Sequence, residues 1–212
     1  MVKVKICGLS TAESVETAIE TGASFVGFVF YAASPRHVTL QQAKTLANRA
    51  RDRAKIVALI VDADNAAIRA IGDTVNPDYF QVHGTETPER IAEIARLTAR
   101  RVIKAIKVAD ASHIQAAAKY ADVADFILFD AKAPETLASA LPGGNGVAFD
   151  WKLLEKSKGF MLSGGLNSEN VWNAIAVTGA SMVDVSSGVE KAPGIKDLGL
   201  IRKFIERATA AS

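Results

Sequence analysis

Four side chains that can move protons or bind polar groups follow short apolar runs at distant places in the chain. Cys7 ends the run VKVKIC, His83 follows DYFQV, Asp130 ends DFILFD, and Asp184 lies within SMVDVSS. A thiol beside cations can act as a general base, and a carboxyl group in apolar surroundings can act as a general acid. These residues predict acid-base catalysis if the fold brings them together, with His83 orienting the substrate.

Each of these residues also has a plainer interpretation. A lone cysteine is most often a small buried hydrophobe, and an aspartate after an apolar run is often a helix cap or part of a surface ion pair. The chain has three histidines, and their scattered positions predict no metal site. We expect His37 and His113 to be ordinary residues, and we expect no metal.

Two glycine-bearing segments are candidates for binding a phosphate group. SGGLNSEN (163–170) and SSGVEKAPG (186–194) follow the last two apolar runs. Backbone N–H groups that no side chain shields can bind an anion there. The candidate phosphate ligands are Gly164, Gly165, Ser187 and Gly188.

One arginine is a candidate for binding a carboxylate. Arg36 lies in the tripeptide Ser34-Pro35-Arg36, where the proline restricts the turn. Its guanidinium group can form two parallel hydrogen bonds with a carboxylate, although a solvated surface arginine is the commoner case. With the glycine segments, this residue predicts a substrate that carries a phosphate and a carboxylate.

The elements that must position these residues alternate along the chain. Short runs rich in β-branched residues predict strands, and Ala-rich stretches between them predict helices. Predicted strands cover residues 2–7, 24–30, 55–62, 78–84, 101–108, 125–130, 159–165 and 181–187, and predicted helices include 11–21, 40–54, 65–75, 88–99 and 111–121. Helix-start residues are expected at Asp64, Thr87, Asp110, Asp150 and Asn167.

This alternation predicts an α/β protein with parallel strands, because the helices are long enough to cross from one strand to the next. Eight such units in 212 residues predict a (β/α)8 TIM barrel that forms a single domain over residues 1–212. An open doubly wound sheet is the alternative. In a barrel, the period of two turns Lys3, Lys5 and Cys7 inward, and the C-terminal strand ends gather the candidate residues in one mouth.

The longest predicted connection is APETLASALPGGNGVAF (133–149), which follows the sixth strand. Loops at this position border the catalytic end of a barrel, and the glycines here predict a mobile loop. We expect a deletion in this segment to damage activity more than folding.

Composition and charge exclude several classes of protein. The chain is 49% hydrophobic and 7% aromatic, which is typical of a core built from aliphatic residues around parallel strands. Its 25 Lys and Arg residues against 23 Asp and Glu give a net charge of +2, too small to attract nucleic acid or an anionic membrane. With Cys7 as the only cysteine and no long apolar stretch, we expect a cytoplasmic protein, either monomer or homodimer.

Seven segments together resemble successive motifs of the phosphoribosylanthranilate isomerase family of tryptophan biosynthesis. They are KICGLS (5–10), GFVFYAASPRHV (27–38), QVHG (81–84), FDAK (129–132), GGNGVAFDW (143–151), LSGGLNSENV (162–171) and VDVSSGVEKAPGIKD (183–197). The resemblance covers almost the whole chain. It departs at Asn145, where the family more often has Thr or Ser.

The resemblance implies an Amadori rearrangement of N-(5-phosphoribosyl)anthranilate to 1-(2-carboxyphenylamino)-1-deoxyribulose 5-phosphate, with no metal or organic cofactor. Asp130 would protonate the ribose ring oxygen, and Cys7 would remove the proton at C2 of the sugar. Arg36 would hold the anthranilate carboxylate, and Asp184 would accept a hydrogen bond from the substrate. The two glycine segments would hold the phosphate.

Three other functions share parts of this pattern. The related isomerase of histidine biosynthesis would be expected to use paired carboxylates at about the first and fifth strands, where this chain has Cys7 and the run IKV. A Schiff-base aldolase would need an amine such as Lys104 or Lys107. A non-catalytic phosphate-binding protein would keep the glycine segments without needing an acid and a base that face each other.

Overall fold

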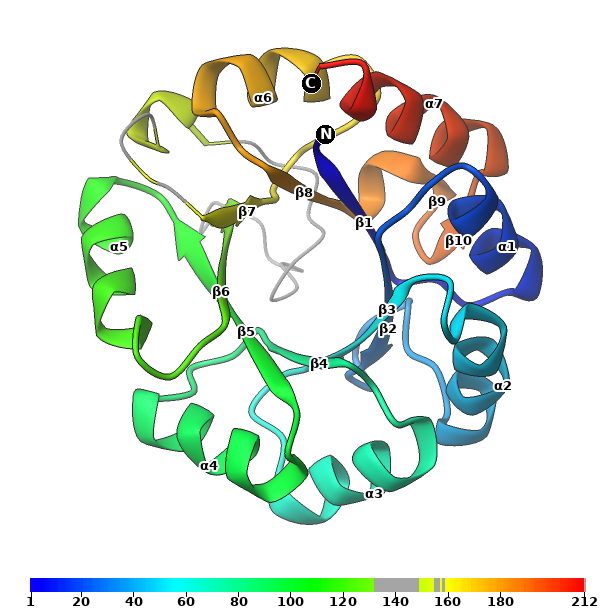
Figure 1. Cartoon of the computed structure of the whole chain (residues 1–212), viewed down its shortest axis with the longest axis vertical. Helices are drawn as coiled ribbons and strands as arrows, with labels where there is room; N and C mark the ends of the chain where they lie inside the picture. Colours follow the sequence, from blue (N-terminus) through cyan, green and yellow to red (C-terminus); the bar gives the residue numbers. More distant parts are fainter. Residues whose placement is uncertain (132–148, 155–156, 158, 212) are drawn as a thin grey trace.

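A computed structural model describes residues 1–131, 149–154, 157 and 159–211 of the chain. Its main feature is a closed barrel of eight parallel strands, in which each strand pairs with the next and β8 pairs with β1. Helices surround the barrel (Figure 1). The (β/α)8 barrel prediction is therefore confirmed, and the open sheet is wrong. The predicted mobile loop lies outside the described residues, apart from its last residue, Phe149.

All eight predicted strands are present. The strands are β1 (Lys3–Cys7), β2 (Phe25–Phe30), β3 (Lys55–Ile60), β4 (Tyr79–Val82), β5 (Arg101–Val108), β6 (Phe126–Ala131), β7 (Phe160–Leu162) and β8 (Met182–Val185). Most are shorter than predicted. β3 ends at Ile60 and β7 at Leu162, and Asp62 and Gly164 just beyond them have φ values of +45° and +90°, which a strand does not allow.

Seven α-helices cover the barrel in the described part of the chain. They are α1 (Ala12–Glu20), α2 (Leu40–Ala50), α3 (Asn65–Val75), α4 (Pro88–Thr98), α5 (Ala111–Ala116), α6 (Val171–Thr178) and α7 (Leu198–Thr209). The described part also contains three short 3-10 helices: η1 (Ala117–Tyr120), η2 (Trp151–Leu154) and η3 (Ser187–Val189). A small antiparallel hairpin, β9 (Glu190–Ala192) and β10 (Ile195–Lys196), was not predicted and forms within the second glycine-bearing segment and just beyond it.

Four of the five predicted helix starts are confirmed. Asp64, Thr87 and Asp110 each accept a hydrogen bond from a backbone N–H of the first helical turn, at 2.8, 3.3 and 2.8 Å. Asp150 does the same for η2 at 3.1 Å. The prediction for Asn167 is wrong in position, because α6 begins only at Val171 and the Asn167 side chain caps the turn that comes before it.

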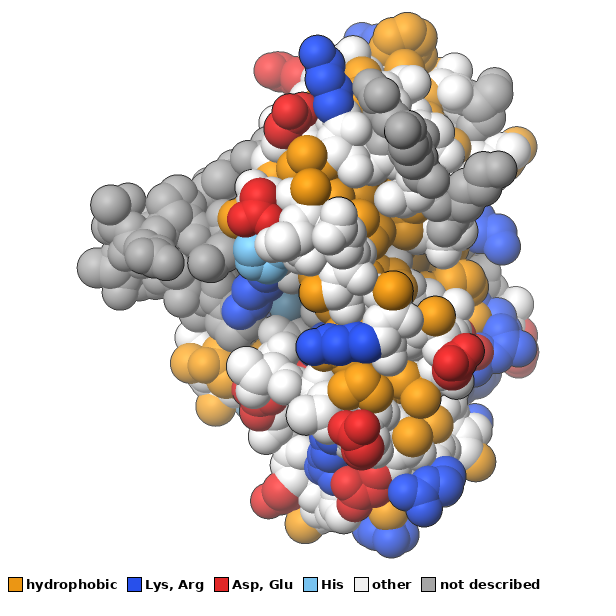
Figure 2. All heavy atoms as spheres, turned by 90° about the vertical axis from the view of Figure 1, so that its left-hand side faces the viewer, with side chains coloured by type: hydrophobic (Ala, Val, Ile, Leu, Met, Phe, Trp, Pro, Cys, Tyr) orange, Lys and Arg blue, Asp and Glu red, His pale blue; other side chains and the backbone are white. Residues whose placement is uncertain are grey.

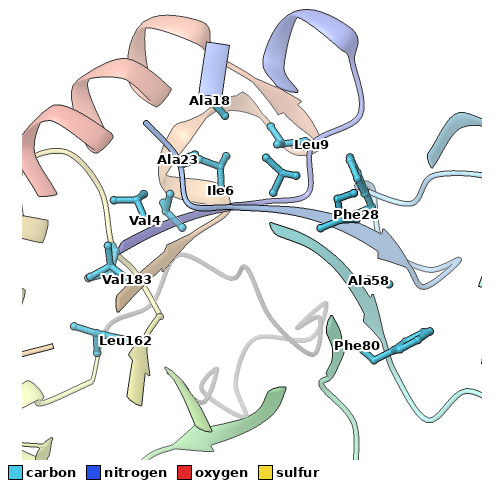
Figure 3. Packing of buried hydrophobic residues seen from close by; sticks show 14 of the residues in the cluster. Val4, Ile6, Leu9, Ala18, Ala23, Phe28, Ala58, Phe80, Leu162 and Val183 are labelled. Carbon is cyan, nitrogen blue, oxygen red and sulfur yellow. The ribbon is translucent and has the colours of Figure 1, made fainter. Parts of the chain in front are cut away.

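Side chains that leave the strands outward form the large core between the barrel and the helices. Figure 3 shows Val4 and Ile6 of β1 in this layer, together with Phe28, Phe80 and Val183 from other strands. The predicted alternation in β1 is confirmed, since Val4 and Ile6 belong to this core while Cys7 packs in a separate cluster and Lys5 pairs with Asp184. Apolar residues close the bottom of the interior: Phe25, Val57, Tyr79, Ile103, Ala105, Leu128, Met161 and Met182. Polar side chains above this floor therefore face the mouth.

The outer surface mixes charges of both signs. On the flank around α5, basic, acidic and apolar side chains are interspersed (Figure 2). The exposed large hydrophobic residues in the described parts are Met1, Trp172 and Ile195. None of the helices described is long and apolar enough to cross a membrane.

Candidate active site

The candidate residues lie at the mouth of the barrel, because each is at or near the C-terminal end of its strand. Cys7 ends β1, His83 follows β4, Asp130 lies in β6 and Asp184 lies in β8. All four are at least 95% buried. Because β6 is separated from β1 by β7 and β8 in the closed order, Asp130 and Cys7 approach the mouth from well-separated sides.

Cys7 is a buried thiol at the inner wall. It packs with Val29 and Leu59, and Gly8 turns the chain out of the strand with a φ of +75°. Burial raises the pKa of the thiol, while the cations Lys5 and Lys196 act to lower it. The balance leaves the pKa above its ordinary value, so the thiol of the protein alone carries its proton at neutral pH. The neighbouring cations act in the direction that a general base requires, but burial outweighs them in the protein alone.

Beneath the thiol lies a buried ion pair that the sequence analysis missed. The Lys5 ammonium group is fully buried and donates to Asp184 Oδ1 at 2.9 Å, while the Ser163 hydroxyl donates to Oδ2 at 3.3 Å. Burial alone would lower the Lys5 pKa, but Asp184 and Cys7 raise it above its ordinary value. Lys5 is thus a permanent cation. The available signal was a lysine at an inward position two residues before the cysteine.

Asp130 belongs to a chain of polar groups that runs across to β4. Its Oδ2 lies 3.2 Å from His83 Nε2, and its Oδ1 accepts from the backbone N–H of Ala131 at 3.0 Å. The other ring nitrogen of His83, Nδ1, lies 3.3 Å from Gln81 Nε2. His83 therefore contacts the proposed acid directly. Gln81 was not predicted.

Arg36 is buried, so the alternative of a solvated surface arginine is wrong. Its Nε and Nη2 donate to the two carboxylate oxygens of Glu190 at 2.8 and 2.9 Å. Lys196 donates to Glu190 Oε1 at 2.8 Å. Burial raises the pKa of Glu190, but both cations outweigh it and hold the pKa below the ordinary value. A Cβ at Gly8 would lie 2.7 Å from Arg36 Cδ, so the glycine lets the arginine cross the end of β1 close to Cys7.

The two glycine-bearing loops pack against each other. A Cβ at Gly188 would lie 1.9 Å from the carbonyl oxygen of Leu166, and one at Gly164 would lie 2.4 Å from the Ala131 nitrogen. Gly164 and Gly165 also have φ values of +90° and +65°. Their N–H groups donate no hydrogen bond within the described part of the chain. Together with Ser187 and Gly188 at the start of η3, they can present backbone donors to an anion.

The two lysines considered for a Schiff base occupy different places. Lys104 lies on the outward face of β5, where its ammonium group donates to Glu86 Oε2 at 2.8 Å and to the Gly84 carbonyl oxygen at 2.9 Å. It therefore faces away from the mouth. Lys107 shares the inward face and is the register partner of Asp130, but it is exposed.

His37, His113 and Asp62, the aspartate after β3, do not belong to this group of candidate residues. His37 is exposed, and His113 pairs with Asp110 on the surface at 3.2 Å. Asp62 accepts from the backbone N–H of Thr85 at 2.8 Å and so ties two loops together. These three residues are explained by local structure alone.

A buried thiol and a buried carboxyl group at one barrel mouth are the groups that a proton-transfer enzyme needs, and the closed barrel places the chain in the class of (β/α)8 enzymes. Comparison with known proteins narrows this class. Residues 4–207 match the family described as N-(5'phosphoribosyl)anthranilate (PRA) isomerase, and the chain belongs to that family. This confirms the family that the sequence motifs resemble, and with it an isomerase of tryptophan biosynthesis.

Relatives and solved structures agree over the full length. N-(5'-phosphoribosyl)anthranilate isomerase of Rhizobium meliloti (strain 1021) is 51% identical over 212 residues, which cover 99% of this chain and 98% of the relative. The counterpart from Rhodopseudomonas palustris (strain BisA53) is 53% identical over 210 residues, covering 98% of this chain and 95% of the relative. The crystal structure of phosphoribosyl anthranilate isomerase from Thermotoga maritima has a TM-score of 0.88 at 37% identity, covering 99% of this chain and 100% of that one.

Proposed function

We propose that Cys7 and Asp130 carry out the proton transfers by which this chain isomerises N-(5-phosphoribosyl)anthranilate to 1-(2-carboxyphenylamino)-1-deoxyribulose 5-phosphate. The observation that carries the proposal is their placement at one mouth, from β1 and β6, with 3% and 4% of their surface exposed. A pentose bound between them would present its ring oxygen to one group and C2 to the other. Exclusion of water strengthens the electrostatic effect of both.

Asp130 acts first, as the general acid. It gives its proton to the ribose ring oxygen, the bond from that oxygen to C1 breaks, and the nitrogen lone pair forms the C1=N bond of an iminium ion. His83, 3.2 Å from the carboxyl group, holds Asp130 in place. A buried carboxyl group that carries a proton can supply the one that ring opening requires.

Cys7 acts second, as the general base. As the thiolate, it removes the proton from C2, and the electrons of that bond form C1=C2 while the C1=N electrons return to nitrogen. The product is an enolamine, which tautomerises to the ketone. Each positioned acid or base contributes about 10² to 10⁴-fold to the rate.

The groups around the pair bind the rest of the substrate. Arg36 binds the anthranilate carboxylate, with Glu190 fixing the plane of the guanidinium group, and Asp184 accepts a hydrogen bond from the substrate. Gly164, Gly165, Ser187 and Gly188 bind the phosphate. A crystal structure of phosphoribosyl anthranilate isomerase in complex with reduced 1-(o-carboxyphenylamino)-1-deoxyribulose 5-phosphate supports such a ligand, since that protein has a TM-score of 0.85 at 34% identity over 99% of this chain and 100% of that one.

The test uses Cys7→Ser and Asp130→Asn, with Asp122→Asn as the control. Asp122 is an exposed carboxylate just before β6, and its loss should leave turnover unchanged. We expect both site variants to bind a product analogue yet lose about 10² to 10⁴-fold in kcat, measured by the fluorescence decrease of freshly made substrate. Turnover near the wild-type value in either variant would remove that residue from the mechanism.

The assembly and location of the chain remain predictions. A dimeric phosphoribosylanthranilate isomerase is known from Thermotoga maritima, and its monomer structure has a TM-score of 0.85 at 34% identity over 99% of this chain and 100% of that one. We expect a cytoplasmic monomer or homodimer that binds a small phosphorylated substrate and neither nucleic acid nor membrane. The mass in solution decides between the two assemblies.

A further inference from the structure

The proposed mechanism leaves one charged group at the base of the site without a role. Lys5 has no exposed surface, although lysine is almost never fully buried unless it is paired. It faces the barrel interior from the same strand as Cys7, two residues earlier. A buried lysine that served only the fold could be replaced by an apolar residue, as in the floor of the barrel just beneath it.

Gly27 shows how close this cation lies to the sulfur. A Cβ built on Gly27 of the neighbouring strand would be 3.1 Å from Cys7 Sγ and 3.3 Å from Lys5 Nζ. The thiol and the ammonium group therefore border the same small space, which exists because residue 27 has no side chain. A side chain at residue 27 would press on both groups.

The charges that face the thiol are of both signs. Lys5 on β1 and Lys196 on β10 favour the thiolate, and Asp184 on β8 opposes it. Lys196 is held by Glu190 at 2.8 Å, so part of its charge is neutralised there. Lys5 is held by Asp184 at 2.9 Å in the same way. Asp184 therefore weakens the effect of Lys5 on the thiol, because the carboxylate neutralises part of the positive charge of Lys5.

We propose that Lys5 is a positioning residue that stabilises the thiolate of Cys7 from inside the barrel, and that Asp184 controls how much of its charge reaches the sulfur. The inference rests on the proposed role of Cys7 as the base. When a substrate N–H or O–H group donates to Asp184, the carboxylate holds Lys5 less strongly, and the cation favours the thiolate more. The thiol proton leaves to solvent, and the thiolate then accepts the C2 proton.

The single cysteine of the chain makes the test direct, because ultraviolet absorbance of the thiolate as a function of pH reports Cys7 alone. Lys5→Met removes the cation while keeping most of the side-chain volume. Lys3→Met is the matched control, since Lys3 shares the strand and the inward face but is exposed and farther from the sulfur. Cys7→Ser supplies the baseline for the absorbance.

We expect Lys5→Met to raise the titration midpoint of the thiol by about one pH unit, a tenfold loss of thiolate at a given pH. Asp184→Asn should lower the midpoint, because it removes the opposing carboxylate. Lys3→Met should change neither the midpoint nor the activity. In the kinetic profile, kcat/KM of Lys5→Met at neutral pH should fall about tenfold and its acidic limb should shift with the midpoint, while KM stays near the wild-type value.

An unchanged midpoint in folded Lys5→Met, or shifts of the same sign in Lys5→Met and Asp184→Asn, would overturn the inference. If Lys5→Met does not fold, the double variant with Asp184→Asn keeps the site neutral. Its midpoint should then lie above that of Asp184→Asn alone, and equal midpoints would contradict the role of Lys5. The titration needs no turnover, so it is independent of the proposed function, which fails instead if Cys7→Ser remains active.

Discussion

At the scale of single residues, Arg36 is held in one orientation by Glu190. Glu190 accepts from both its Nε and its Nη2, and Lys196 supports Glu190 from the other side. This bidentate pairing fixes the orientation of the guanidinium group before a substrate arrives. Preorganisation of this kind reduces the entropy lost on binding.

Replacing Arg36 by alanine should therefore weaken substrate binding more than catalysis. Charge-assisted hydrogen bonds contribute about 1.5–3 kcal/mol, so we expect KM to rise about 10- to 100-fold with little change in kcat. The fold should survive because Lys196 still pairs with Glu190. Arg69→Ala, which removes an exposed arginine on α3, is the control, and steady-state kinetics of both variants are the measurement. An unchanged KM in Arg36→Ala would contradict carboxylate binding by this residue.

Position along a strand predicted which residues reach the mouth, but not which residues pair there. Cys7 and Asp130 were found because each ends an apolar run. The partners were not found, since Lys5 and Asp184 are 179 residues apart and Arg36 and Glu190 are 154 residues apart. Only closure of the barrel brings such residues together, and a single sequence carries no signal of that register.

At the scale of elements, the two glycine-bearing loops form one structure. Gly188 has no positive φ, so it is required because a Cβ there would lie 1.9 Å from the Leu166 carbonyl oxygen of the other loop. Any side chain at residue 188 must push the loops apart. The donors of both loops would then no longer converge on one anion.

Gly188→Ala should consequently raise KM by about tenfold or more, the effect of losing one or two hydrogen bonds to a charged phosphate. Gly179→Ala is the control. Gly179 ends α6 with a φ of +66° and has nothing within 4 Å of a Cβ, so its replacement should cost about 1–2 kcal/mol of stability and leave KM unchanged. Kinetics and thermal unfolding of both variants separate the two effects. Equal KM values in the variants would show that contact between the loops does not matter for binding.

The order and type of the elements were predictable, and their ends were less so. Just beyond β3 and β7, Asp62 and Gly164 adopt a positive φ, and such local departures are not visible in the pattern of residue types. The hairpin of β9 and β10 was missed because its strands have three and two residues, too few to show a period. The start of α6 was misplaced because Asn167 caps a turn instead of the helix itself.

At the scale of the whole molecule, closure joins the two ends of the chain. β1 pairs with β8, and α7 packs on β1 and between α1 and α6 (Figure 1). The last helix thus covers the first strand, which carries both Cys7 and Lys5. We expect residues 1–212 to behave as one domain for this reason, with no stable half that could fold without the other.

A chain that lacks residues 198–212 tests this expectation. The removed helix buries Ile201, Phe204 and Ile205, and burial of such side chains contributes about 1.5–3 kcal/mol each. Their combined contribution is comparable with the whole stability of a typical domain, about 5–15 kcal/mol. We therefore expect the shortened chain to lose cooperative thermal unfolding and near-ultraviolet circular dichroism, whereas a chain that lacks only residues 211–212 should keep both. A cooperative transition in the longer deletion would mean that the first strands hold together without the last helix, and the single-domain prediction would be wrong.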